Sequence, residues 1–307
     1  KPELVVYAYD SLVSKNGLGP KVFPEFEKQC GCRLRVIAVG DGGKLLNRLQ
    51  LDAAAKKQVA QVALGLDEPV FARARQWLEP WGEWKPKGLE KLLPEVAASQ
   101  SKRLSQGFLP FDRGVFALMV DREGLKKAKL VAPKKLSELL EPRFRRTLLL
   151  QDPRTSTPGL AFLLYSHALH GSGSAGLADF WTNLKPSWLT LAPGWDEAYG
   201  LFLKGEAPLV WSYTTSQAYH LEHGDPGRYE AVLFDEGQPM QVEGAAFLKG
   251  AAGNELARKF MEFLISPAFQ KQVPLGNWML PVVSGITLPE SFKKIPQAKK
   301  YVATASD

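Results

Sequence analysis

The stretch that decides the fold runs from Leu148 to His220. It opens with LLLQDPRTSTPGLAFLLYSHALH (148–170) and resumes with PGWDEAYGLFLKGEAPLVWSYTTSQAYH (193–220). An apolar run, a helix start rich in hydroxyl side chains, a second strand (187–192), a helix (195–205) and a third strand (207–213) follow one another in this region. Because strands that alternate with helices pair in parallel, this order predicts an α/β sheet covered by helices.

The amino-terminal part repeats the same alternation. Strands are predicted at 3–9, 33–40 and 62–66, and helices at 21–30 and 43–57. Ligands of such sheets bind beyond the carboxyl ends of the strands. Tyr9, Asp10 and Ser11, which follow the first strand, and Asp67, which follows the third, are therefore expected at the mouth of a site.

Three later segments indicate two discontinuous lobes. Residues 111–121 are typical of a long strand that crosses between lobes, and 229–234 and 241–249 of return strands. We expect one lobe from 1–112 with about 240–275 and another from 113–239 with about 276–307, with hinge strands near 111–120 and 229–249. Residues 254–265 show the apolar stripe of a core helix, and 80–108, rich in Pro and Trp, predicts loop and short helix.

A hydroxyl-rich turn precedes the helix predicted at 158–170. Thr155, Ser156 and Thr157 stand before Pro158, a residue favoured at the first helical position, so Thr157 is the expected N-cap. The free N–H groups of a first helical turn, the helix dipole and three hydroxyls together suit an oxyanion. For an isolated TSTPG a plain capped helix is the better interpretation, and Arg154 either adds charge or points to solvent.

Aromatic residues gather in the second half of the same stretch. They are Trp195, Tyr199, Trp211, Tyr213 and Tyr219. Flat aromatic faces suit a flat cationic ring, so the whole stretch fits a phosphorylated aromatic cation. Trp211 lies in mid-strand and is assigned to the core, whereas Tyr199, within a helix, is left undecided.

Composition bounds the remaining possibilities. The chain has 307 residues, is 45% hydrophobic and carries a net charge of +7. Its basic residues are scattered rather than clustered, which argues against nucleic acid. The two cysteines and four histidines show no metal-binding spacing, so neither a metal nor a resident cofactor is expected.

The cysteines, Cys30 and Cys32, form a C-x-C pair just before a strand. An oxidising compartment permits a disulfide, although residues so close in sequence strain its geometry. A disulfide and two free thiols both stay open. The disulfide is favoured, without a functional role.

Long ordered matches over most of the chain resemble the thiamine-binding solute receptors of bacterial ABC importers. The runs are VY-YDS (6–11), DG--LLNRL (41–49), LGLD (64–67), QDPRTSTPGL (151–160), GW-EAYGLFLKGE (194–206), SYTTS-AYH (212–220), SPAFQ (266–270) and GNWM-P (276–281). The resemblance implies a two-lobed periplasmic binding protein of type II with its ligand in the interlobe cleft. It also implies an exported, monomeric protein, with Lys1 near the mature N-terminus after signal-peptide removal. Such a protein binds thiamine and its mono- and diphosphate and passes them to an ABC permease without chemistry.

The resemblance further implies which residues meet the ligand. The aromatic contacts are Tyr9, Trp195, Tyr213, Tyr219 and Trp278. The turn 155–157 faces the cleft and meets phosphate. By their chemistry, Asp10 and Glu243 are candidates to counter the cation or to accept from the exocyclic amine, although carboxylates at strand ends are often only caps or surface groups.

Two positions depart from the family pattern. The family can carry a tryptophan where this chain has Asn16 and a tyrosine where it has Arg113. The preference among thiamine, its monophosphate and its diphosphate therefore stays open.

Two alternatives share the fold. A thiamine-degrading enzyme needs a cysteine nucleophile, and only Cys30 and Cys32 are present, at the end expected to lie opposite the cleft mouth. A ferric-ion receptor would use Tyr213 and Tyr219 as phenolate ligands. The abundance of tryptophan near the site and the weak case for a partnering histidine argue against iron.

Overall fold

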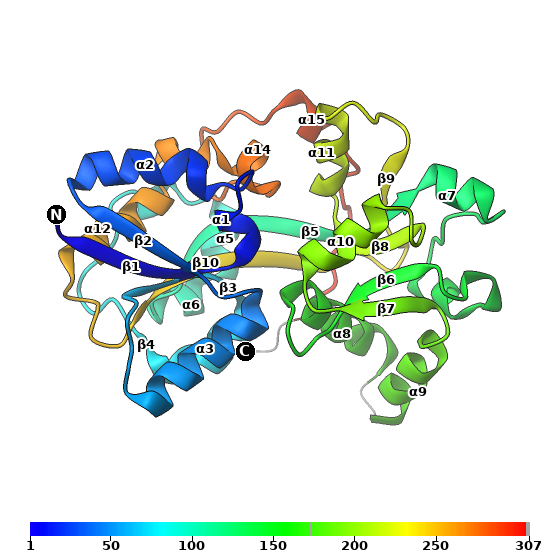
Figure 1. Cartoon of the computed structure of the whole chain (residues 1–307), viewed down its shortest axis with the longest axis horizontal. Coiled ribbons are helices and arrows are strands. Elements are labelled where there is room, and N and C mark those ends of the chain that lie inside the picture. Colours follow the sequence, from blue (N-terminus) through cyan, green and yellow to red (C-terminus); the bar gives the residue numbers. More distant parts are fainter. Residues whose placement is uncertain (172–173, 305–307) are drawn as a thin grey trace. The chain divides into compact units, whose positions relative to one another are not determined.

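The chain folds into two compact α/β units, seen in a computed structural model that describes residues 1–171 and 174–304 (Figure 1). The first unit comprises residues 1–113 and 242–289, and the second comprises 114–241 and 290–307. Strands β5 (Leu109–Asp121) and β10 (Met240–Leu248) each contribute residues to both units. This two-unit α/β architecture agrees with the alternating pattern of strands and helices in the sequence.

The sheet of the first unit is mixed. Strands β1 (Glu3–Ala8), β2 (Arg33–Ala38) and β3 (Val62–Asp67) are parallel, in the order β2-β1-β3. Strand β10 runs antiparallel to β3, and the short β4 (Leu78–Glu79) runs antiparallel to β10. The parallel strands place Tyr9 and Asp67 at their carboxyl ends, at one edge of the sheet.

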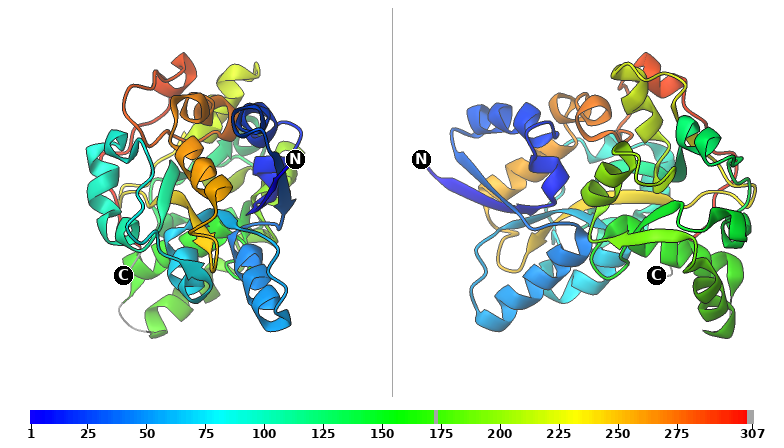
Figure 2. Two further views of the ribbon diagram at one scale, coloured as in Figure 1. Left: turned by 90° about the vertical axis from the view of Figure 1, so that its left-hand side faces the viewer. Right: turned by 45° about the vertical axis from the view of Figure 1, so that its right-hand side comes forward.

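Helices cover both faces of this sheet (Figures 1 and 2). Helices α3 (Gly42–Ala55) and α4 (Glu68–Ala74) pack on the face that carries Val5 and Tyr7 of β1. Helices α2 (Gly19–Cys30) and α12 (Glu255–Leu264) pack together, with the ring of Phe26 edge-on to that of Phe260 at 5.1 Å. Because β1 is buried on both faces, it is a continuous apolar run rather than an alternating one.

Residues 276–289 belong to the first unit, not to the second as the sequence predicts. Backbone bonds join Arg113 and Leu280 in both directions, at 3.0 and 2.7 Å. The amide of Gln270 also donates to Phe111 O (2.8 Å) and accepts from the N–H of Val282 (3.0 Å). These long-range bonds leave no local signal in the sequence. Five further short helices complete the unit: α1 (Asp10–Val13), α5 (Pro94–Ser99), α6 (Ser101–Ser105), α13 (Pro267–Gln270) and α14 (Val273–Asn277).

In the second unit, β6 (Leu148–Gln151) is parallel to both β7 (Trp188–Ala192) and β8 (Leu209–Tyr213). Strand β5 is antiparallel to β8 and to β9 (Tyr229–Val232). The carboxyl ends of β6, β7 and β8 therefore lie at one edge of the sheet.

Alternate side chains of β6 belong to two different clusters of the core. Leu148 and Leu150 pack among residues of α8 (Thr157–His170) and α9 (Ser174–Leu184). Leu149 packs with residues of α10 (Trp195–Leu203). Among the described residues, the other α-helices of the unit are α7 (Arg122–Lys127), α11 (Thr215–Glu222) and α15 (Glu290–Lys293). Within the described residues, no helix combines the length and the apolarity that crossing a membrane requires.

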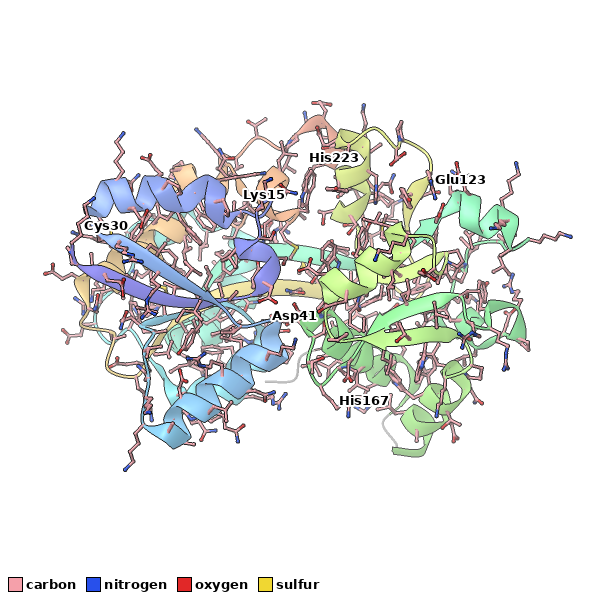
Figure 3. All side chains as sticks on the ribbon, in the orientation of Figure 1. Lys15, Cys30, Asp41, Glu123, His167 and His223 are labelled. Atoms are coloured by element: carbon pink, nitrogen blue, oxygen red, sulfur yellow. A yellow bond between two sulfur atoms is a disulfide. The ribbon has the colours of Figure 1, made fainter. Side chains whose placement is uncertain are left out.

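Cys30, at the end of α2 and labelled in Figure 3, forms a disulfide with Cys32. Their Cα atoms are 5.1 Å apart, and Gly31 between them adopts a left-handed conformation with φ of 61°. The favoured interpretation of the C-x-C pair is thereby confirmed. The disulfide closes the turn between α2 and β2.

Candidate ligand-binding site

The hydroxyl-rich turn lies at the start of α8, one residue out of the predicted register. Ser156 is the N-cap, and Thr157 is the first residue of the helix, so the prediction of Thr157 as the N-cap is wrong. The side chain of Ser156 is buried, with 1% exposed, and its Oγ has no hydrogen-bond partner in the part of the chain that the structure describes. The hydroxyl of Thr155 donates to Pro193 O at 2.6 Å, which joins the turn to the end of β7.

The start of α8 packs tightly against the carboxyl end of β6. A Cβ added to Gly159 would lie 2.5 Å from Gln151 O, so only glycine fits there. The first-turn N–H groups of Thr157 and Gly159 have no acceptor within the helix, because helical bonding begins four residues in. Together with the dipole, these N–H groups make the helix start a place for an anion.

The guanidinium of Arg154 forms an ion pair and so does not offer an unpaired charge to the turn at 155–157. Its Nη2 lies 2.6 Å from Asp152 Oδ2, and its side chain is 85% exposed. The hydrogen bonds from Arg154 lower the pKa of the Asp152 carboxyl, against the opposing effect of partial burial. This ion pair is therefore a surface feature of the loop between β6 and α8.

Trp195 is the first residue of α10 and follows the carboxyl end of β7. Its half-buried ring stacks on Tyr199 at 4.8 Å with an interplanar angle of 16°, and its Nε1 donates to Ser212 Oγ at 2.8 Å. Tyr199, undecided from the sequence, is buried, and its hydroxyl lies 2.8 Å from His220 Nε2. The buried ring of Tyr199 therefore covers one face of the Trp195 ring.

Tyr213 and Tyr219, which follow Trp195 in the chain, have half-buried side chains. Tyr213, the last residue of β8, stacks on Phe116 at 4.6 Å and donates its hydroxyl to Gln241 Oε1 at 2.7 Å. Tyr219 on α11 stacks at 4.1 Å on His223, which is labelled in Figure 3. The turn at 155–157, Trp195 and Tyr213 all follow or end parallel strands of this unit, so they lie at the same edge of its sheet.

Trp211 belongs to the core, as its mid-strand position predicts. Its side chain is fully buried, and its ring stacks on Tyr165 at 5.8 Å. Its Nε1 donates to Pro158 O at 3.1 Å. This bond connects β8 to the first turn of α8 and so helps to hold the helix start in place.

In the first unit, Asn277, the residue before Trp278, is hydrogen-bonded to Tyr9. The amide of Asn277 donates to the hydroxyl of Tyr9 at 2.7 Å, and that hydroxyl donates to Glu243 Oε2 at 3.1 Å. Trp278, the next residue, caps α14 in a left-handed conformation with φ of 54° and is half-buried. Burial and then the charge of Glu243 raise the pKa of the Tyr9 hydroxyl well above its ordinary value.

Asp10 plays a different part from its neighbour. Its side chain is exposed, and its Oδ1 accepts the N–H of Gly40 at 2.8 Å. This bond ties the end of β1 to the loop after β2. One oxygen of Asp10 is therefore bonded to the loop, and the exposed carboxylate stays a candidate for ligand contact.

Asp112 is a site residue that sequence reasoning missed. It is fully buried on β5, and its Oδ2 accepts the amide of Asn277 at 2.5 Å. One signal was present, because an aspartate interrupts the apolar run LPFDRGVFALMV. Asn277 lies within the GNWM run, but the sequence does not predict that its side chain links Tyr9 to Asp112.

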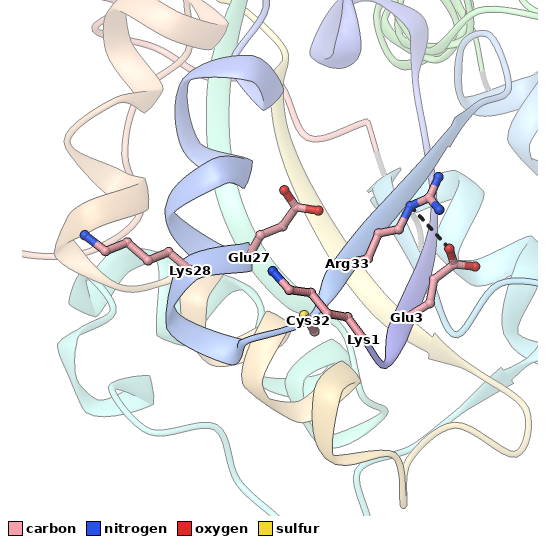
Figure 4. A pocket seen from close by; sticks show the side chains of 6 residues that line it. All are labelled: Lys1, Glu3, Glu27, Lys28, Cys32 and Arg33. Carbon is pink, nitrogen blue, oxygen red and sulfur yellow. Dashed lines mark ion pairs between the residues drawn. The ribbon is translucent and has the colours of Figure 1, made fainter.

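A separate hollow lies at the opposite, amino ends of β1 and β2 (Figure 4). It measures about 580 Å³ and is lined by Lys1, Glu3, Glu27, Lys28, Cys32 and Arg33. An ion pair of 3.6 Å joins Arg33 and Glu3 across it. Mixed charge and a position away from the carboxyl ends of the strands do not favour it as the ligand site.

Two α/β units that share β5 and β10, with aromatic rings and a helix start at the carboxyl ends of their strands, form an arrangement typical of ligand-binding α/β proteins. Residues 74–305 match the family described as bacterial extracellular solute-binding protein, and the chain belongs to this family.

Relatives extend the likeness to nearly the whole chain. The thiamine-binding periplasmic protein of Brucella melitensis is 42% identical over 301 residues, which cover 98% of this chain and 85% of that protein. The protein of the same name from Escherichia coli is 41% identical and covers 96% of this chain and 85% of its own length. A solved structure described as a periplasmic thiamin binding protein is 40% identical, with a TM-score of 0.84 over 99% of this chain and 90% of that one.

Proposed function

We propose that this protein is a periplasmic receptor that binds thiamine and its mono- and diphosphate and delivers them, without chemical change, to an ABC permease. The observation that carries the proposal is the 42% identity, over 98% of the chain, to a protein named for thiamine binding. The receptor works as a monomer and needs no cofactor.

The aromatic residues support recognition of a thiazolium ring. Trp195, Tyr213 and Tyr219 in the second unit, and Trp278 in the first, are half-buried and so keep part of each ring accessible. A cation–π contact contributes about 0.5 to 2 kcal/mol, whereas nanomolar affinity needs about 12 kcal/mol. Several rings must therefore act together, with hydrogen bonds, to hold thiamine tightly.

The start of α8 supports recognition of phosphate. Ser156 Oγ is buried and has no partner among the described residues, an arrangement that costs free energy until an acceptor arrives. A phosphate oxygen at the helix start would accept from this hydroxyl and from the first-turn N–H groups. Thiamine itself lacks this group, so the turn should matter only for the phosphorylated ligands.

One structural observation argues against each of the two alternative functions. A thiamine-degrading enzyme needs a free thiolate, but Cys30 and Cys32 are joined in a disulfide. A ferric site needs phenolate oxygens, and the hydroxyl of Tyr213, one of the two candidates, donates to Gln241. These observations support a receptor for the organic cation.

The proposal is tested by calorimetric titration of the full chain with thiamine, its monophosphate and its diphosphate. Trp195→Ala should weaken all three ligands, because it removes a ring that meets the part they share. Trp188→Ala is the matched control, because Trp188 is a half-buried tryptophan at the amino end of β7. Absence of saturable binding at micromolar ligand, or equal losses in the two variants, would defeat the proposal.

The phosphate contact is tested separately with Ser156→Ala. The variant removes only the unpartnered hydroxyl, so the fold should be unaffected. A lost hydrogen bond to a charged group is worth about 1.5 to 3 kcal/mol, which predicts roughly 10- to 100-fold weaker binding of both phosphates. Unchanged binding of the phosphates, or an equal loss for thiamine, would show that the turn at 155–157 does not meet phosphate.

A further inference from the structure

Two buried carboxyl groups lie beside Tyr9 in the first unit. Asp112 on β5 is fully buried, and Glu243 on β10 is 7% exposed. Asn277 binds Asp112 Oδ2, and Tyr9 binds Glu243 Oε2. The two carboxyls are therefore part of the network that holds Tyr9, a proposed ring contact, and Asn277, the residue before Trp278.

Asn277 donates to Asp112 Oδ2 and to the Tyr9 hydroxyl, which in turn donates to Glu243 Oε2, so the two carboxyls meet in one buried network. Two ionised carboxylates in one buried site repel each other, so one of them holds a proton. Asp112 Oδ1 meets no donor among the described residues, and a shared proton supplies one. Burial and then the charge of Glu243 raise the pKa of the Asp112 carboxyl well above its usual range, while the bond from Asn277 lowers it.

Tyr9, Arg113 and Asp67 are titratable groups that neighbour the pair. Tyr9 is neutral, because its pKa is raised. Arg113, next to Asp112 in the chain, has its Nη2 3.7 Å from Glu95. Asp67, opposite Glu243 in the pairing of β3 with β10, caps the start of α4 through Oδ1. One proton over two carboxyls leaves the pair with a single negative charge.

We propose that Asp112 and Glu243 share one proton and act together as a single negative counter-charge, which makes the site beside Tyr9 select a cationic ring over a neutral ring of the same shape. The inference rests on the proposed function, because it takes Tyr9 as a ligand contact. A buried charge is costly unless it is compensated, and a monocation compensates it. A unit charge about 7 Å away, at an effective dielectric constant near 20, changes affinity roughly 50-fold.

The test compares thiamine with its thiophene analogue, in which carbon replaces the charged ring nitrogen. Asp112→Asn and Glu243→Gln each put an amide in place of the protonated carboxyl, and the amide donates to the carboxylate that remains. Either single variant keeps the negative charge, so thiamine affinity should change by less than about threefold. The double variant has no charge, so thiamine should bind roughly 50-fold more weakly and the analogue as before.

Two titration results would overturn the inference. The first result is a loss of thiamine affinity of similar size in each single variant, with the two losses adding in the double variant. It would mean that both carboxyls are ionised. Equal losses of thiamine and of the thiophene analogue in the double variant would mean that the pair serves packing alone. Circular dichroism and the urea midpoint of each variant check that the fold is retained.

A measurement without ligand separates this inference from the proposed function. The infrared spectrum of the ligand-free protein at neutral pH should contain the C=O stretch of a protonated carboxylic acid, and each single variant should lack it. Absence of that band in the unaltered protein overturns the shared proton whether or not thiamine binds. A band that is present while thiamine fails to bind refutes the proposed function and the counter-charge role together.

Discussion

Gly65 on β3 is the position at which a single methyl group should disturb the site most. Its φ is 94°, and a Cβ built there would overlap ring carbons Cδ1 and Cε1 of Tyr9. A residue other than glycine at positive φ costs about 1 to 2 kcal/mol. Displacing Tyr9 would also break its bonds with Glu243 and Asn277, at about 1 kcal/mol each. Gly65→Ala should therefore lose about 3 to 4 kcal/mol of unfolding free energy.

Gly82→Ala separates the two contributions. Gly82 also has positive φ, 65°, but a Cβ there meets nothing within 4 Å. In urea unfolding followed by tryptophan fluorescence, this control should lose only the unfolding free energy that comes from the backbone conformation, about 1 to 2 kcal/mol. Under the proposed function, thiamine affinity should fall in Gly65→Ala to the level of Tyr9→Ala and stay unchanged in Gly82→Ala. Equal stability losses in the two glycine variants would refute the reasoning from the Tyr9 ring.

Three further predictions concern pH, the disulfide and the surface ion pair. Burial lowers the pKa of His220 from 6.5 to about 4, so unfolding takes up a proton between these pH values. The contribution of His220 to the unfolding free energy is therefore complete above pH 6.5 and should fall by up to about 3 kcal/mol as the pH drops towards 4. A urea midpoint that does not change with pH in this window would contradict the prediction. Because the loop closed by Cys30 and Cys32 is so short, replacing both by serine should cost only about 1.5 kcal/mol in urea unfolding, and a loss of the folded state would show that the disulfide does more than close a turn. Arg154→Ala should leave the affinity for thiamine monophosphate within about twofold in calorimetry, because the arginine is exposed and paired with Asp152, and a tenfold loss would place Arg154 in the anion site.

The regular elements could be predicted closely, because each has a local cause. The helix expected at 158–170 is α8, Thr157–His170, and the strand expected at 33–40 is β2, Arg33–Ala38. The cap was misplaced by one residue because Ser156 and Thr157 are both good N-caps and Pro158 is tolerated at either of the first two helical positions. The register is decided by contacts with other strands, through Thr155 to Pro193 and the close approach of Gly159 to Gln151.

The sequence by itself determined the order of strands and helices, the hydroxyl turn before α8 and the assignment of Trp211 to the core. Apolar periodicity and turn residues are local properties, so a reader of the chain can see them. Only the tertiary structure decided that residues 276–289 join the first unit and that Asp112 lies against Glu243 and Asn277. Whether a polar side chain is exposed, paired or left without a partner depends on residues far away in the chain. For that reason the aromatic side chains proposed to contact the ligand could be picked out from the sequence, whereas the buried acid pair beside Tyr9 could not be predicted.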